Sequence, residues 1–283
     1  MEYGAVVAEA IFTTRTGDNI LTPGPLYVPG TSPGDYQRTS PGPPQPVNTN
    51  APNWVPFALT SVSQFRPNGP ARLTSTRYAR DLLEVHALGG TISVLRTADQ
   101  EQIARWHTEM AQFQFNRIAR VETAADGLGL LEHARLFALL NIALADATAS
   151  VFDAKYTFAF WRPVTAIRNA DSDGNPDTFA DPLWIPFLTT PPHPEYPAAH
   201  GVVQAAGATV METYFGRHYA FTATSPTVPG VTRAYAGFDA FTAEGAFARI
   251  LGGMHFRASL EERGKQGKRV AQWVLEHSLL PVD

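Results

Sequence analysis

The chain has 283 residues, no cysteine and a formal net charge of -4, and this length suits one large domain or two small ones. The lack of cysteine excludes disulfides and thiolate metal sites. A hydrophobic fraction of 44% with a charged fraction of 17% indicates a folded globular chain, and the acidic balance argues against general nucleic-acid binding without excluding a small basic cavity.

The N-terminal part of the sequence predicts an extended arm. Residues 1–19 have no basic region and too short an apolar run for a signal peptide, and the compartment stays open. Residues 21–56 carry ten of the 23 prolines, a composition that breaks regular helices and strands. A disordered linker is the alternative, but several side chains could fix the arm to the body: Leu26, Tyr27, Val28, Tyr36, Trp54 and Phe57. We expect residues 1–74 to pack on a body of residues 75–283, as a single structural domain overall.

The sequence of the body predicts helices. Residues 75–90 end on a glycine pair that suits a helix C-cap. Residues 97–124 begin with Thr97 and Gln100 in a capping-box pattern. Residues 129–160 are apolar around most of their circumference, which is typical of a central helix in a bundle.

The most apolar run, residues 136–152, is interrupted by Asn141 and Asp146, so we interpret it as a buried helix rather than a membrane span. Further helices and loops follow along the chain, with helices expected at 198–214, 240–253 and 260–278 and loops at 171–197 and 222–238. Alternating strand patterns are nearly absent, so the predicted fold class is all-α.

Lys155 and Arg162 bring charge into an apolar neighbourhood. They stand seven residues apart, or two helical turns, so both could face one side of a helix before Pro163 ends it. A solvated helix face is the alternative. The aromatic neighbours favour charges that need a partner or a ligand.

Residues 193–201, HPEYPAAHG, combine a rigid loop with a helix start. Pro197 occupies a position typical of the first helical residue. The backbone N–H groups of Ala198, Ala199 and His200 would then be unpaired donors that favour an anion. His200 would add a titratable proton, and a structural role for this histidine is the alternative.

Arg249 and His255 stand six residues apart on a segment that contains a pair of glycines at 252 and 253. A glycine within a helix costs about 1 kcal/mol relative to alanine, which is tolerable where something must approach the backbone closely. Tight helix packing beside a core histidine is the alternative.

Together, Lys-x6-Arg-Pro, Pro-x-x-His and Arg-x5-His resemble the signature of the superfamily of vanadium-dependent haloperoxidases and type 2 phosphatidic acid phosphatases. The surrounding LLNIALADATASVFDAKYTFAFWRPVTAIR, PPHPEYP and GGMHFR look like the bacterial haloperoxidase-like branch. With the Pro-rich arm and residues 57–73, the resemblance covers nearly the entire chain. It implies an all-α helical bundle of the vanadium haloperoxidase and acid phosphatase type with a long Pro-rich N-terminal arm.

The resemblance further implies a cup for a vanadate or phosphate oxyanion. Lys155, Arg162 and Arg249 match the side chains that hold its oxygens, and the backbone N–H of Ala199 matches a further donor. Two guanidinium groups and one ammonium can neutralise a polyanion that would be costly to bury alone. The oxyanion cup, as the term is used below, consists of the side chains of Lys155, Arg162, His200, Arg249 and His255.

The resemblance assigns the chemistry to two histidines, with Lys155 as a third catalytic residue. His255 matches the axial ligand of the metal vanadium, or the nucleophile of the phosphatases, and must present a neutral ring nitrogen. His200 matches the acid–base histidine. Vanadate would activate hydrogen peroxide to oxidise a halide, without a change of oxidation state at vanadium, for the halogenation of a small organic substrate.

Other positions bear on the halide and on affinity. His193, seven residues before His200, looks bromoperoxidase-like, and the alternative is a polar loop residue. His193 and Trp161 form the expected halide or substrate pocket. Ala198 and Ala199 stand where the family has serine and glycine, and a lost hydrogen bond to a charged group costs about 1.5–3 kcal/mol. Vanadate is therefore expected to bind weakly, and phosphate can occupy the same site.

Ser259 stands where one family variant has an aspartate four residues after the axial histidine. We therefore expect His255 to bond another acceptor, such as a backbone carbonyl.

The predicted function is a vanadate-dependent haloperoxidase that favours bromide. The alternatives are an acid phosphatase with His255 as nucleophile and a vanadium-independent, non-redox homologue whose cup grips an organic substrate. Family members are often longer at the N-terminus, so a neighbouring copy could replace a missing helix in a homodimer.

Overall fold

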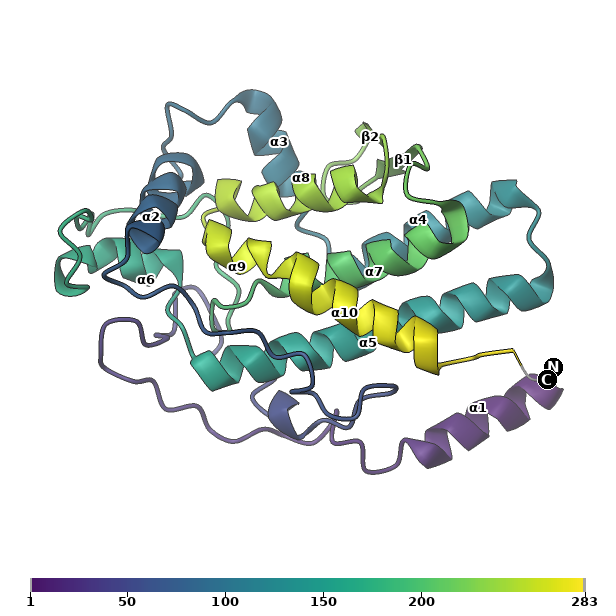
Figure 1. Ribbon diagram of the computed structural model, residues 1–283. Coiled ribbons are helices and arrows are strands. Elements are labelled where there is room, and N and C mark those ends of the chain that lie inside the picture. Colours follow the sequence, from purple (N-terminus) through teal and green to yellow (C-terminus); the bar gives the residue numbers. More distant parts are fainter. Residues whose placement is uncertain (1, 282–283) are drawn as a thin grey trace.

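The computed structural model describes residues 2–281, which form a helical bundle with one short hairpin (Figure 1). The helices in chain order are α1 (Glu2–Thr14), α2 (Thr76–Gly89), α3 (Ala98–Trp106), α4 (Ala111–Asp126), α5 (Leu130–Phe158), α6 (Pro163–Arg168), α7 (Ala199–Phe215), α8 (Phe238–Leu251), α9 (Arg257–Glu261) and α10 (Arg263–His277). Two single 3-10 turns, η1 (Ala51–Asn53) and η2 (Ala170–Ser172), and the strands β1 (Phe221–Thr224) and β2 (Thr232–Tyr235) complete the elements. The all-α prediction is confirmed.

Helix α5 is central to the bundle. It contacts α4, α7 and α10, and α7 and α10 lie along it in Figure 1. Leu136, Leu139, Leu140 and Leu144 on α5 are at most 1% exposed. Among the described residues, α5 is the one helix long and apolar enough to cross a membrane, yet 67% of its most apolar window is buried inside the protein. A helix that is apolar on all sides is typical of such a central position.

Small residues let α7 and its neighbours pack closely. A Cβ at Gly267 of α10 would stand 2.2 Å from the carbonyl oxygen of Val202 on α7. A Cβ at Gly207 of α7 would stand 2.7 Å from the ring of Phe115 on α4. Glycine at these two positions sets the distance between helices, because any side chain would force them apart.

The region predicted as one helix over 97–124 forms two helices instead. The predicted capping box of Thr97 and Gln100 is present at the start of α3. The helix then ends at Trp106, and His107 leaves helical geometry with φ -91° and ψ 21°. Its imidazole packs against Trp106 and Phe241 and is fully buried. The tertiary contacts of His107 thus override the local helical pattern.

The region predicted as a loop over 222–238 contains the β1–β2 hairpin. The two strands are antiparallel, with Phe221 paired with Tyr235. These two side chains are buried and pack on Phe238 and Phe241 of α8. The hairpin therefore covers α8 with aromatic side chains, and the loop prediction was wrong for residues 222–224 and 232–235.

The arm lies along the segment that carries Lys155 and Arg162. The N–H of Tyr36 donates to the Ala159 carbonyl at 2.7 Å, and the N–H of Trp161 donates to the Gly34 carbonyl at 2.8 Å. Tyr36 is 1% exposed, and its ring centroid lies 5.5 Å from that of Tyr27. This part of the arm is joined to the body by backbone hydrogen bonds and tyrosine rings.

Not every predicted anchor of the arm is buried. Leu26 and Val28 are 79% and 83% exposed, so the expectation was wrong for both. Trp54 is partly buried and Phe57 is half-exposed. Prolines hold this part of the arm extended, and in an extended chain neighbouring side chains alternate between the body and solvent. The boundary between residues 74 and 75 stays a prediction.

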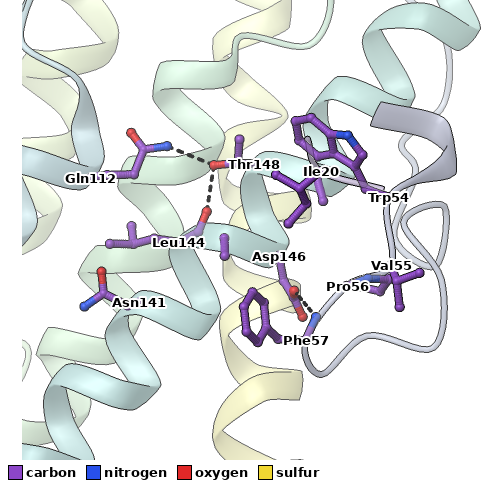
Figure 2. Close-up of a pocket in the computed structure, with 12 residues that line it drawn as sticks. Ile20, Trp54, Val55, Pro56, Phe57, Gln112, Asn141, Leu144, Asp146 and Thr148 are labelled. Atoms are coloured by element: carbon purple, nitrogen blue, oxygen red, sulfur yellow. Dashed lines mark hydrogen bonds between the residues drawn. The ribbon is translucent and has the colours of Figure 1, made fainter. Parts of the chain in front are cut away.

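Asp146 ties the end of the arm to α5. This fully buried carboxylate accepts hydrogen bonds from the N–H groups of Phe57, Ala58 and Leu59 at 2.6, 2.8 and 3.0 Å. Figure 2 shows Asp146 pointing at Phe57 beside an apolar cavity of about 310 Å³, which the arm and α5 line together. The acid that interrupts the apolar run of α5 is therefore the acceptor for three backbone donors.

We expect the Asp146→Ala variant to lose about 2–3 kcal/mol of unfolding free energy, because three backbone donors lose their acceptor. Urea unfolding measures this loss, and limited proteolysis should show faster cleavage within residues 15–59. The control is Asp177→Ala, an exposed carboxylate in the 171–197 loop, which should change stability by at most about 0.5 kcal/mol. Equal stability of the two variants would contradict this role of Asp146.

Candidate oxyanion site

The residues predicted from sequence converge from separate segments. Lys155 lies in the last turn of α5, and Arg162 precedes α6. Helix α5 ends at Phe158, and Ala159 adopts a left-handed conformation with φ 43°. The interpretation that both cations face one side of a single helix was therefore wrong. A reversal of the chain, rather than helical spacing, places Arg162.

Lys155 and Arg162 are fully buried and are held by backbone carbonyls. Lys155 Nζ donates to the carbonyls of Pro194 and Glu195 at 2.8 and 2.9 Å. Arg162 Nε donates to the His193 carbonyl at 2.7 Å, and its Nη1 donates to the Met254 carbonyl at 2.9 Å. Carbonyls satisfy the donors without neutralising the charge.

Arg249 and His200 carry buried polar atoms that have no partner. Arg249, in the last turn of α8, donates to the His107 carbonyl at 3.2 Å and contacts the Met254 sulfur at 3.1 Å. Among the described residues, neither Arg249 Nε nor His200 Nε2 has a hydrogen-bond partner. Buried polar groups are nearly always paired in folded proteins, so these two atoms are candidates to bind a polar ligand.

The start of α7 differs slightly from the prediction. Ala198 is the N-cap and Ala199 the first helical residue, so Pro197 lies one residue before the cap. The Ala198 N–H donates to the Ser259 carbonyl at 3.3 Å. The N–H groups of Ala199 and His200 remain in the first turn, where helical geometry provides no partner within the helix.

His255 presents one ring nitrogen to the cations and the other to an acid. Its Nδ1 lies 2.9 Å from Glu195 Oε1, and its Nε2 lies 3.1 Å from Arg162 Nη1. Because guanidinium can only donate and carboxylate can only accept, this network assigns the proton to Nδ1 and a lone pair to Nε2. The expectation of a backbone carbonyl as the acceptor was wrong, since the acceptor is the Glu195 carboxylate.

Glu195 is the residue that the sequence analysis missed. It is fully buried, and Ser259 Oγ donates to its Oε2 at 2.6 Å. An acid between prolines and aromatic residues in HPEYP was a usable signal, because such a setting buries charge that needs partners. Ser259, noted as a departure from the family pattern, thus bonds the acid that bonds His255.

His193 and Trp161 have different surroundings. His193 Nδ1 lies 2.9 Å from Arg162 Nη2, and its ring centroid lies 5.0 Å from that of Phe152. The structure therefore brings His193 to the oxyanion cup. Trp161 is 2% exposed and packs with Phe160 in a buried aromatic cluster, and its role in a substrate pocket stays a prediction.

The site has an excess of positive charge. Burial lowers the pKa of Arg162 to about 10 and that of Arg249 to about 9, so both are cationic at neutral pH. Burial, and then repulsion by Arg162, lower the pKa of Lys155. Burial raises the pKa of Glu195, and the Ser259 hydroxyl and the nearby cations oppose that effect.

The three histidines at the site add no positive charge. Burial lowers the pKa of His193, His200 and His255 well below the usual value, and neighbouring cations lower each further. The carbonyls of Pro194 and Glu195 favour the cationic form of Lys155, and with it three cationic side chains face one carboxylate. An anion would compensate the excess, since a buried charge needs a counter-charge.

Vanadate and phosphate fit this set of groups. Their oxygens would accept hydrogen bonds from Arg249 Nε and the first-turn N–H groups of α7, and the lone pair of His255 Nε2 could ligate vanadium. The described residues contain no group of three or more His, Asp or Glu side chains placed to hold a metal ion. A resident group would thus be bound chiefly through its oxygens.

A second polar network, centred on Glu244, holds the residue whose carbonyl accepts a hydrogen bond from Arg249. Glu244 on α8 accepts hydrogen bonds from His107 Nε2 at 3.0 Å, Arg233 Nη2 at 2.9 Å and the Tyr235 hydroxyl at 2.7 Å. Arg233 and Tyr235 belong to β2. The network therefore fixes the hairpin and His107, whose carbonyl binds Arg249.

Comparison with known proteins identifies the family of this chain. A family model described as the VCPO second helical-bundle domain matches residues 135–282. The vanadium chloroperoxidase of Curvularia inaequalis is 35% identical over 96 residues, which cover 30% of this chain and only 15% of that protein.

Solved structures also match nearly the whole chain. A bacterial vanadium-dependent iodoperoxidase superposes with a TM-score of 0.84 at 27% identity, over 98% of this chain and 68% of the other. A bacterial vanadium-dependent chloroperoxidase gives a TM-score of 0.76 at 18% identity, over 96% and 71%, which shows a shared fold.

The fold and the family match define a class of protein, the superfamily of vanadium haloperoxidases and type 2 phosphatidic acid phosphatases. Within it, the chain belongs to the family of the VCPO second helical-bundle domain, because the family model matches more than half of its length.

The Glu244 network predicts a defined loss of stability in acid. Burial alone would raise the pKa of Glu244, but its hydrogen bonds, first that from His107, lower it to about 2. Since the pKa of Glu244 in the folded protein lies below its usual value of 4.5, the stabilisation is complete above about pH 4.5 and is lost as the pH falls toward 2. For this partly exposed group we expect about 1–2 kcal/mol.

Urea unfolding of the wild type and the Glu244→Gln variant should measure this effect. The difference in unfolding free energy should stay constant from pH 7 to about 5 and should shrink below about pH 4.5. A difference that does not change with pH would show that the Glu244 charge contributes nothing to stability.

Proposed function

We propose that this protein is a vanadate-dependent haloperoxidase that uses hydrogen peroxide to oxidise halide, with bromide favoured, for the halogenation of a small organic substrate. The observation that carries the proposal is the oxyanion cup itself. Three buried cations face one carboxylate, Arg249 Nε and His200 Nε2 have no hydrogen-bond partner in the described part of the chain, and His255 offers a lone pair. The family match supports the same class of activity.

In this proposal, the side chains of Lys155, Arg162 and Arg249 bind the oxyanion oxygens, and the Ala199 N–H adds a neutral donor. His255 Nε2 would ligate vanadium through its lone pair. When bound, vanadate supplies a Lewis-acidic centre that activates peroxide while its oxidation state stays constant.

His200 exchanges a proton with the substrate. Burial and the nearby Arg249 lower its pKa, so the ring is neutral at neutral pH and can accept a proton from hydrogen peroxide. We assign the exchange to Nε2, which has no hydrogen-bond partner among the described residues. The cationic Arg249 thus helps to keep His200 neutral, so that this histidine can act as a base beside a bound anion.

The halide preference rests on His193. This residue occupies the position that looks bromoperoxidase-like, and it lies beside Arg162 in the cup. The relatives are described as a chloroperoxidase and an iodoperoxidase, and their halides belong to those proteins.

An acid phosphatase is the second candidate. His255 has a proton on Nδ1, held by Glu195, and a lone pair on Nε2. This arrangement also suits a nucleophile that attacks phosphorus. The geometry of the histidine alone therefore fits both chemistries, and an assay must separate them.

The test is bromination of phenol red with hydrogen peroxide and bromide, before and after addition of orthovanadate. We expect activity that depends on vanadate. The Arg249→Gln variant should bind vanadate about tenfold to a hundredfold more weakly, because it loses a charged donor. The control is Arg257→Gln, which removes a surface arginine paired with Glu84 and should keep wild-type affinity.

Release of phosphate from an aryl phosphate, with no bromination, would favour the phosphatase. If neither reaction occurs, and neither vanadate nor phosphate binds in calorimetry, the cup serves another ligand, as in a non-redox homologue, and the proposal fails.

We also propose that Ala198 weakens vanadate binding. As the N-cap of α7, Ala198 offers no side-chain hydrogen bond to the helix or to an anion. The Ala198→Ser variant should bind vanadate about tenfold more tightly. Its free energy of unfolding should be about 1 kcal/mol higher, because serine is a good N-cap. Greater stability with unchanged vanadate affinity would show that the hydroxyl acts only as a cap.

A further inference from the structure

Glu195 joins three of the segments that form the oxyanion cup. Its backbone N–H donates to the Phe160 carbonyl at 2.8 Å, and its own carbonyl accepts from Lys155 at 2.9 Å. Its carboxylate accepts from His255 Nδ1 at 2.9 Å and from the Phe256 N–H at 3.0 Å, both at Oε1. One residue thus connects the end of α5, the 193–197 loop and the segment before α9.

Both carboxylate oxygens of Glu195 have a partner. Oε1 bonds His255 and Phe256, and Oε2 accepts the Ser259 hydroxyl at 2.6 Å. Glu195 is 0% exposed, His255 is 1% exposed and Ser259 is 2% exposed, so water does not compete for these bonds. A carboxylate bonded at both oxygens in a dry site has one orientation, and it fixes the ring it bonds.

The orientation decides which nitrogen of His255 faces the cup. With the proton on Nδ1, the lone pair of Nε2 accepts from Arg162 Nη1 at 3.1 Å. With the proton on Nε2, the ring would turn an N–H toward the guanidinium N–H, and Nδ1 would face the carboxylate without a proton. Glu195 therefore selects the tautomer whose lone pair points at the cup.

We propose that Glu195, oriented by Ser259, is a positioning residue that gives the oxyanion cup its preference for vanadate over phosphate. The inference rests on the proposed function. It follows from a chemical difference between the two anions. Vanadate readily accepts a nitrogen ligand and so uses the His255 lone pair, whereas phosphate binds through its oxygens alone.

The charge of Glu195 has the opposite effect on anion binding. Its negative charge reduces the positive excess of Lys155, Arg162 and Arg249, so its removal should strengthen the binding of any anion. A positioning role and a purely electrostatic role therefore predict different results for the two anions, and a comparison of vanadate with phosphate separates them.

The test uses the Glu195→Gln variant of the full chain, titrated by calorimetry with orthovanadate and with inorganic phosphate. We expect the ratio of vanadate affinity to phosphate affinity to fall by about tenfold or more, while phosphate binds as well as before or better. The Ser259→Ala variant keeps the charge and should lower the ratio less.

A spectroscopic readout tests the tautomer directly. In 15N-histidine NMR of the ligand-free protein, the His255 ring of the wild type should give the pattern of a proton on Nδ1, assigned through the His255→Gln variant. The Glu195→Gln variant should shift toward a proton on Nε2 or a mixture. The Glu195→Gln/Ser259→Asp double variant, which returns a carboxylate from α9, should recover both the pattern and the affinity ratio.

The control is Asp153→Asn, a buried acid on α5 that pairs with Arg66 outside the cup. It should lower stability and leave the ratio and the His255 pattern unchanged. Equal tightening of both anions in Glu195→Gln would assign Glu195 a charge role only, and equal weakening would assign it a structural role only. Either result overturns the inference. Wild-type protein that binds neither anion would instead refute the proposed function.

Discussion

The structure depends on the burial of three cations in one site. Transfer of an isolated ammonium or guanidinium from water into a protein interior costs several kcal/mol, and Lys155 and Arg162 are fully buried. Carbonyl oxygens that accept hydrogen bonds from the two side chains offset most of this cost. Three of these carbonyls lie in one loop, at His193, Pro194 and Glu195, and the fourth lies in another, at Met254. Their dipoles stabilise the charges, and one carboxylate compensates only part of the total.

The prolines of the 191–197 loop fit this task. Proline has a carbonyl but no N–H, so a Pro-rich loop offers acceptors to a cationic site while it buries few donors that need partners. Pro194 donates nothing and accepts from Lys155, and the Pro192 carbonyl accepts from Val47 of the arm. Pro194, which looks like a simple loop residue in the sequence, thus supplies the negative end of a dipole to a buried cation.

The parts of the fold and of the site that could be predicted are those whose signals are local in the sequence. Helical periodicity and capping gave α2, α5 and the start of α3, because these signals lie within a few residues. Family resemblance brought together Lys155, Arg162, Arg249 and the histidines, since their types and spacing survive as a pattern. The reversal at Ala159 was missed, because a non-glycine residue at positive φ leaves no local signal. The split at His107 and the β1–β2 hairpin were missed since tertiary contacts with Glu244 and Phe238 create them.

Glu195 was missed for a different reason, which bears on how this site is built. For His255, an acceptor other than residue 259 was expected, such as a backbone carbonyl, but the structure supplies a carboxylate from 60 residues away, with Ser259 as a donor to that acid. The requirement is physical: a neutral histidine with its lone pair toward a cationic cup needs an acceptor behind it. Any segment that reaches Nδ1 can provide that acceptor. The carboxylate must therefore lie at one place in space, but it can come from different positions along the chain. Geometry therefore requires an acceptor behind His255 without requiring that acceptor to lie at a particular place along the chain.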